Sequence, residues 1–104
     1  MQLLRQAGYD IVARNFRCRL GELDIIARHG RQLVIAEVRL RSSAAFGGPA
    51  ASVSAAKRAR IVRATRYLLL CRPELAQLAL RFDTLLLASS AGVIEWIEGA
   101  FDAG

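Results

Sequence analysis

The chain has 104 residues, a length that suits one compact domain and leaves little room for two. Hydrophobic residues make up 54% of the chain, which argues against disorder, and no apolar run reaches the roughly 18 residues of a membrane-spanning helix. The first residues show no secretory leader, and two cysteines are too few for a disulfide scaffold. We therefore expect a single cytoplasmic domain with reduced thiols and no membrane partner.

Positive charge is concentrated in the middle third of the chain. The net charge is +6, and the segment between Glu37 and Glu74 holds eight of the fifteen basic residues and none of the nine acidic ones. A localised basic segment is typical of proteins that bind nucleic acid, because cationic side chains neutralise phosphates. The alternative is a solvated helix face in an arginine-rich protein, and charge alone does not separate the two.

The N-terminal part of the chain predicts a short helix followed by three strands. Residues 1–7 fit one or two helical turns, and Gly8 suits the position after a helix end. The strands are expected over residues 9–17, 22–28 and 32–40. The last of them is apolar on both faces, which indicates a strand inside a covered sheet. The short links between the strands predict an antiparallel meander.

The rest of the chain predicts one long helix followed by two strands. A loop over residues 42–52 leads to a helix over 54–72, which Ser52 or Ser54 can cap and Pro73 ends. A short helical stretch over residues 74–78 and strands over 81–88 and 93–97 follow. The inward stripe of the long helix is predicted from its spacing to be Ile61, Ala64, Thr65, Leu68 and Cys71.

This order of elements predicts an α/β domain with a central mixed β-sheet and helices packed on it. Asp83, in the first of the two late strands, is expected to make a structural hydrogen bond or ion pair.

Three acidic residues are candidates for chemistry. Glu22 and Asp24 lie two residues apart on one predicted strand and therefore share a face. The turn at residues 29–31 pairs Asp24 with residue 36, and one step of register places it beside Glu37. Two carboxylates on adjacent strands can hold a hard cation such as Mg²⁺, with Mn²⁺ as a substitute. Such a cation would neutralise a phosphodiester and lower the pKa of an attacking water.

A simpler interpretation is that these acids face solvent or pair with an arginine, and that Arg39 or Arg41 satisfies Glu37 in an ordinary surface ion pair. The surroundings of Glu37 argue against it, since apolar residues precede and follow it in the strand. A charge in such a place is costly unless it is paired or bound to a metal.

Several motifs carry a resemblance to a known family. They are Gly8-Tyr9, Arg14-Asn15-Phe16-Arg17, the segment 21–27, Glu37-Val38-Arg39-Leu40-Arg41 and Arg81-Phe82-Asp83. With them nearly the whole chain resembles the YraN-type family of uncharacterised bacterial proteins, which is similar to PD-(D/E)XK nucleases of the Holliday-junction-resolvase type. The resemblance implies a restriction-endonuclease-like fold, a central mixed sheet flanked by helices. Relative to that family, the helix before Gly8 is short and holds no acidic residue.

The resemblance also implies roles for individual residues. Asp24 and Glu37 would be the metal-binding catalytic carboxylates, Glu22 would assist them, and Arg39 stands where the nuclease motif has lysine. Arginine stays protonated, so Arg39 cannot act as a base but can offset charge on a phosphate. The single lysine, Lys57, begins the inward stripe of the long helix, and such lysines in this superfamily sometimes lie on a neighbouring helix. The alternative is that its stem packs at the core edge and its amine reaches water.

Together these features predict a nucleic-acid-binding protein and a candidate metal-dependent endodeoxyribonuclease, with DNA as the first expected partner and RNA as the second. One alternative is a nuclease fold that has lost its lysine and works only as a DNA- or RNA-binding module. Another is a protein-interaction domain with an acidic partner. The resemblance to resolvases also implies a symmetric homodimer. Contacts with the nucleic-acid backbone are assigned to Arg41, Arg58, Arg63 and Arg66.

Overall fold

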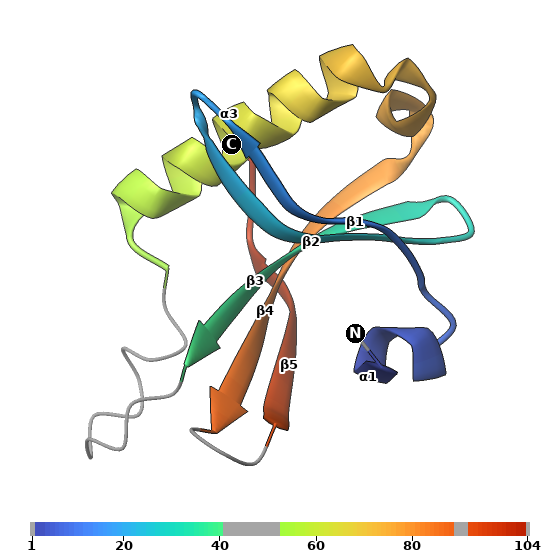
Figure 1. Ribbon diagram of the computed structural model, residues 1–104, viewed down its shortest axis with the longest axis vertical. Helices are drawn as coiled ribbons and strands as arrows, with labels where there is room; N and C mark the ends of the chain where they lie inside the picture. The colour runs from blue at the N-terminus through green and yellow to red at the C-terminus, as the bar shows by residue number, and fades with distance from the viewer. Residues whose placement is uncertain (1, 41–52, 89–91, 104) are drawn as a thin grey trace.

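The computed structural model describes residues 2–40, 53–88 and 92–103. It shows a five-stranded sheet with one long helix packed against it (Figure 1). The elements are α1 (Gln2–Gln6), β1 (Asp10–Cys18), β2 (Gly21–His29), β3 (Gln32–Leu40), α3 (Ala55–Cys71), the 3-10 helix η1 (Pro73–Gln77), β4 (Ala79–Ala88) and β5 (Gly92–Phe101). This order confirms the predicted α/β class with a mixed sheet. The predicted loop over residues 42–52, and with it Arg41, lies outside the described residues.

The strands follow one another across the sheet in chain order, and only β3 and β4 run parallel. The first three strands form the predicted antiparallel meander. Two parallel strands need a crossover connection, which α3 supplies. β3 lies in the middle of the sheet, as its apolar faces predicted. Among the helices of the described residues, none has the length and apolar character needed to cross a membrane.

Strand β5 is longer than predicted, because it continues to Phe101 rather than ending at Ile97. The pairing of β4 with β5 is irregular between Phe82 and Thr84, and Gly99 adopts a φ of 62°. The strand therefore passes through a bulge beside Gly99 and continues beyond the predicted end.

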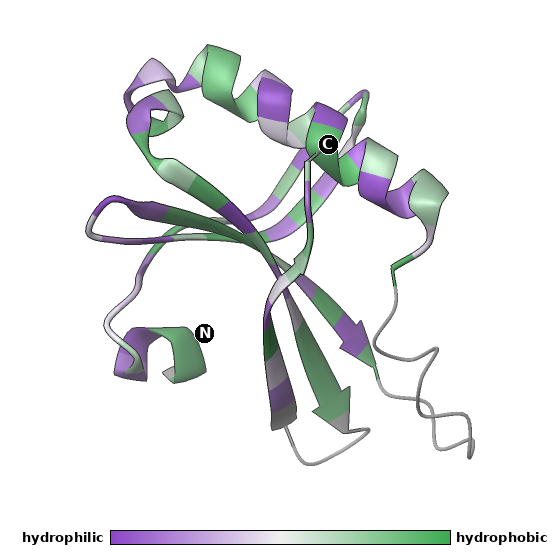
Figure 2. Cartoon of the chain, turned by 180° about the vertical axis from the view of Figure 1, so that it is seen from behind, coloured by the Kyte–Doolittle hydropathy of each residue, from purple (hydrophilic) through white to green (hydrophobic). Residues whose placement is uncertain are grey.

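Each face of the sheet carries its own apolar layer. Figure 2 shows that the strands in the middle of the sheet are largely hydrophobic along their length. Ile35 and Phe82 are buried with Ile61 and Leu68 of α3 on one face. On the other face, Leu4 of α1 is buried in a cluster with six further residues: Tyr9, Ile25, Ala27, Val34, Ala36 and Leu85. Neighbouring residues of β3 therefore enter opposite layers, as the alternation of a strand requires.

Helix α3 begins and ends where its sequence predicted. The Ser54 hydroxyl accepts a hydrogen bond of 3.1 Å from the Lys57 amide and caps the first turn. Four members of the predicted inward stripe are buried, but Cys71 is exposed, so its assignment to the core was wrong. The helix ends at Cys71, and Leu75 of η1 supplies the next buried side chain of this layer.

A fork between β2 and β3 shapes the sheet around the candidate site. Their pairing runs from the turn as far as Ile25 opposite Ala36 and stops there. Leu23 packs in the α3 layer whereas Ile25 packs in the opposite layer, although residues two apart on a regular strand share a face. The end of the β1–β2 hairpin thus turns towards α3 while β3 continues away from it (Figure 1).

Two backbone features accompany this turn of the hairpin. Asn15 has a φ of 52°, a left-handed conformation that asparagine tolerates better than most residues. At the tip of the hairpin, a Cβ added to Gly21 would lie 3.0 Å from the carbonyl oxygen of Arg60. Gly21 therefore permits the close approach of β2 to the backbone of α3.

Candidate active site

The fork brings Asp24 and Glu37 together. Extending the β2–β3 register by one residue beyond the pair Ile25 and Ala36 places these two acids opposite each other. The sequence paired Asp24 with residue 36, or with Glu37 if the register moved by one step. The register of the structure agrees with the second pairing. The Asp24 carboxylate accepts a hydrogen bond of 2.9 Å from the amide of Val38. This contact holds Asp24 beside β3 beyond the last paired residues of the two strands.

Glu37 is a buried acid, with 5% of its surface exposed. Burial, the largest cause, and a hydrogen bond with Asp24 together raise the pKa of its carboxyl from 4.5 to about 7, against the opposing effect of Lys57. Glu37 can therefore carry a proton near neutral pH and donate it in a hydrogen bond to the Asp24 carboxylate.

Lys57 supplies the positive charge of this site. Its Nζ atom lies 3.0 Å from Oε1 of Glu37. Lys57 occupies the first turn of α3, where the helix dipole disfavours a cation, so the buried carboxylate offsets an unfavourable position. The expectation that the amine simply reaches water was incomplete: the side chain is 44% exposed, yet its amine contacts Glu37.

A pocket of about 200 Å³ opens at this point between β2, β3 and α3. It is lined by Glu22, Asp24, Glu37, Lys57, Arg60 and Ile61. Glu22 is exposed and forms an ion pair of 2.8 Å with Arg17. Arg60 is a pocket residue that sequence reasoning missed, although its place three residues after Lys57 puts it near that lysine on the helix surface.

Arg39 does not line this pocket. It follows Glu37 by two residues on β3 and is half-buried, opposite Leu86 of β4. Within the pocket, the cation that contacts the Glu37 carboxyl is Lys57 from the helix.

The chemistry of the donors at this site suits a hard divalent cation. The neighbouring carboxyl groups of Asp24 and Glu37 present adjacent oxygens, which are the ligands that Mg²⁺ prefers. Thr84, opposite Glu37 on β4, has a buried hydroxyl without a hydrogen-bond partner in the described structure. Across the described ranges no three His, Cys, Asp or Glu residues gather as metal ligands. A cation here would therefore need water or substrate oxygens as further ligands.

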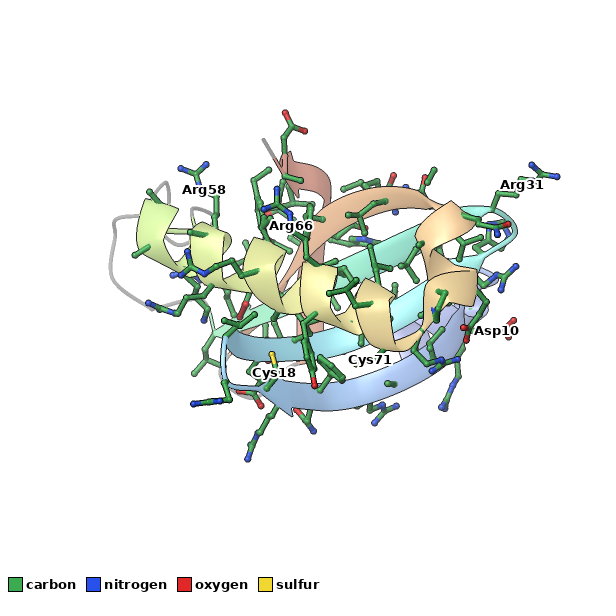
Figure 3. The ribbon with its side chains drawn as sticks, turned by 90° about the horizontal axis from the view of Figure 1, so that it is seen from above. Asp10, Cys18, Arg31, Arg58, Arg66 and Cys71 are labelled. Atoms are coloured by element: carbon green, nitrogen blue, oxygen red, sulfur yellow. The ribbon has the colours of Figure 1, made fainter. Side chains whose placement is uncertain are left out.

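The predicted backbone-binding arginines of α3 lie on a different flank of the helix. Arg58, Arg63 and Arg66 are exposed and line an open groove of about 640 Å³, which they share with the segment 101–103. Figure 3 shows Arg58 and Arg66 projecting from the helix. The groove and the carboxylate pocket have no residue in common. Arg41, the fourth predicted arginine, lies outside the described residues.

Asp83 has the predicted structural role. It is fully buried and accepts four hydrogen bonds, from Nε and Nη2 of Arg81, from the Trp96 indole and from the Gly99 amide. Arg81 also donates to the Tyr9 hydroxyl at 3.0 Å. These contacts raise the pKa of Arg81 and join β4, β5 and the start of β1 away from the carboxylate pocket.

Comparison with known proteins relates this chain to a family of uncharacterised proteins. Residues 1–87 match the model of the uncharacterised protein family UPF0102. A UPF0102 protein of Saccharophagus degradans is 48% identical over 100 residues, which cover 96% of this chain and 83% of the relative. Another, from Nitrosomonas europaea, is 45% identical over 101 residues, covering 95% and 83%. A third, from Bordetella avium, is 49% identical over 102 residues, covering 98% and 68%.

Proposed function

This chain belongs to the UPF0102 family, and we propose that it binds nucleic acid and hydrolyses phosphodiester bonds with the aid of a divalent cation. The observation that carries the proposal is the contact of Asp24 with Glu37 beside the amine of Lys57, in a pocket at the strand fork. A carboxylate pair with an adjacent cation is what metal-assisted cleavage of a phosphodiester requires.

Each residue has a distinct role in this proposal. Asp24 and Glu37 would hold the cation, and Asp24 is already oriented by the Val38 amide. A bound Mg²⁺ supplies Lewis acidity and lowers the pKa of its water. Lys57 has three N–H donors and can orient the attacking water or a phosphate oxygen. Lys57 thereby takes the role that the motif gives to the position of Arg39.

The basic residues of α3 that line the open groove would increase the affinity for nucleic acid and take no part in breaking the phosphodiester bond. Arg58, Arg63 and Arg66 are exposed along one groove, where they can neutralise successive backbone phosphates. Such contacts do not read sequence, and they make binding strongly dependent on salt because counterions are released. DNA is the first substrate to test, with RNA as the second.

One observation favours a second candidate, a nucleic-acid-binding module without catalysis. The Lys57 ion pair and the hydrogen bond between the two acids already satisfy both carboxylates without a metal. If the contacts among Asp24, Glu37 and Lys57 only stabilise the fold, the exposed arginines of α3 can still bind nucleic acid without cleaving it.

The nuclease and the binding module without catalysis are separated by a cleavage assay. The purified protein is incubated with branched and linear DNA in the presence of Mg²⁺, of Mn²⁺ or of a chelator. Asp24→Asn and Glu37→Gln are compared with Glu95→Gln, a matched change at an exposed acid of β5. We expect metal-dependent cleavage that both site variants lose and the control keeps.

Other outcomes would redirect the proposal. Salt-dependent DNA binding without cleavage would favour the binding module, and absence of both would favour a protein-interaction domain with an acidic partner. Unchanged cleavage by Lys57→Ala would remove Lys57 from the mechanism and leave the carboxylates in place.

A further inference from the structure

A second concave surface lies outside the carboxylate pocket, between the tip of the β1–β2 hairpin and α3. We call it the hairpin groove, and it is lined by Arg17, Cys18, Arg19, Leu20 and Tyr67. Its volume of about 550 Å³ is within the range of about 300–1,000 Å³ common for small-ligand sites. Figure 3 shows Cys18 on the hairpin beside α3.

Two large side chains that line the groove, Leu20 and Tyr67, are exposed. Leu20 is 43% exposed and Tyr67 is 44% exposed. The Tyr67 ring packs beside Phe16 with 6.4 Å between ring centroids, so it is supported from the hairpin while much of it stays accessible. A supported and accessible aromatic ring is suited to stack on a flat ring of a ligand.

The charges around the groove indicate an anionic ligand. Arg17 and Arg19 line it and no acidic side chain does. Within the described ranges Arg19 is exposed and has no ion-pair partner. An apolar floor with guanidinium groups at its rim matches a nucleotide, whose base is flat and whose phosphate is negative.

The hairpin groove is also adjacent to the candidate active site. Arg17 of the groove pairs with Glu22, which lines the carboxylate pocket. Gly21, between them in the chain, touches α3 at Arg60 of the same pocket. A strand of nucleic acid held at the carboxylates therefore needs to extend only past the Arg17–Glu22 pair to reach Tyr67.

We propose that the hairpin groove binds an unpaired nucleobase stacked on Tyr67, with a neighbouring phosphate on Arg19. The inference rests on the proposed function and specifies its substrate class: nucleic acid with a single-stranded nucleotide next to the cleaved bond. In an intact duplex the bases are paired and stacked on one another, so they cannot enter the groove.

The test is binding of a single-stranded oligonucleotide that carries 2-aminopurine, a fluorescent base that is quenched when it stacks. A chelator is present, so the signal is independent of cleavage. We expect quenching by the unmodified protein and by Tyr67→Phe, and an affinity about tenfold weaker for Tyr67→Ala, the effect typical of a stacking aromatic. The same strand in a duplex should bind all three proteins alike.

Two further variants make the test specific. Tyr67→Leu keeps an apolar contact for Phe16 but has no ring, and we expect it to bind as weakly as Tyr67→Ala. Leu70→Ala removes another exposed apolar side chain of α3, 79% exposed and outside the groove, and should stay within about twofold of the unmodified protein. Unchanged thermal unfolding of each variant shows that the fold is retained.

The proposal is overturned if Tyr67→Leu binds the oligonucleotide as tightly as the unmodified protein, or if Leu70→Ala loses as much affinity as Tyr67→Ala. It is also overturned if an acidic, phenylalanine-containing peptide binds in a Tyr67-dependent way and the oligonucleotide does not, because the groove is then a protein-docking site. Metal-dependent cleavage of intact duplex DNA at the same rate with and without the Tyr67 ring would refute the nucleobase site but leave the proposed function standing. Absence of binding to any nucleic acid would refute the proposed function with it.

Discussion

The side chain of Glu37 couples the stability of this protein to pH. Its carboxyl is buried against Asp24, and its pKa of about 7 lies above the ordinary value of 4.5. A raised pKa means that the folded protein binds this proton more tightly than the unfolded chain does. The resulting stabilisation is complete below about pH 4.5 and is lost as the pH rises through 7.

We therefore predict that metal-free protein loses stability relative to Glu37→Gln between pH 4.5 and pH 7. The difference in free energy of unfolding should change by on the order of 3 kcal/mol at most, since each unit of pKa is worth about 1.4 kcal/mol. Urea unfolding of both proteins at several pH values measures it. Parallel profiles for the two proteins would contradict the prediction.

Lys57 should contribute to the free energy of unfolding only at pH values at which Glu37 is ionised. At pH 8, Lys57→Ala leaves a buried carboxylate without its cation, and we expect a loss of about 1–2 kcal/mol in the free energy of unfolding. At pH 5, Glu37 is protonated and the loss should largely disappear. Urea unfolding checks this, with Arg60→Ala as the control for another basic residue of the pocket. An equal loss at both pH values would show that Lys57 stabilises by packing alone.

Among the strands, the left-handed residue Asn15 is expected to hold the β1–β2 hairpin in its turned shape. Asn15→Ala should destabilise the protein by about 1 kcal/mol, because alanine adopts positive φ at a cost, whereas Asn15→Gly should be neutral or stabilising. Urea unfolding of the two variants measures the contrast. Equal effects of alanine and glycine would mean that the side chain of Asn15, and not its backbone, matters.

Asp83 joins β4 to β5, and its partner Arg81 contacts Tyr9, so the removal of its charge should be costly. Asp83→Asn keeps the size of the side chain but removes the charge that faces Arg81. We expect a loss of about 3–5 kcal/mol, as for other broken buried ion pairs. Thermal and urea unfolding measure it, and Asp102→Asn, at an exposed acid, is the control with an expected change within about 0.5 kcal/mol. A loss below 1 kcal/mol for Asp83→Asn would contradict the role assigned to this residue.

For the domain as a whole, the order of elements and the central place of β3 could be predicted from apolar periodicity and turn residues. The pairing of Asp24 with Glu37 could be predicted within one step, because the short turn at 29–31 limits the register. For Lys57, the sequence left two alternatives open: a place beside the acids, or a stem at the core edge with the amine in water. The choice between them depends on how α3 crosses the sheet.

What could not be predicted depends on contacts between distant segments. The asparagine at position 15 permits a left-handed conformation but does not require one, so the turn of the hairpin depends also on its approach to α3. Cys71 continues a regular helical stripe, and its exposure results from the chain turning into η1 at that point. The hairpin groove likewise forms from residues about 50 positions apart, so spacing along one strand or one helix gave no sign of it.

The single parallel pairing in the sheet has a consequence for how the chain folds. β1, β2 and β3 pair through short links, and β4 pairs with the next strand, so both sets can form early. β3 and β4 must instead close a long segment of chain, with Gln32 and Ala79 47 positions apart, and we expect this slow closure to limit the folding rate. The two acids then meet within the early meander, whereas the lysine reaches them only when the crossover helix docks.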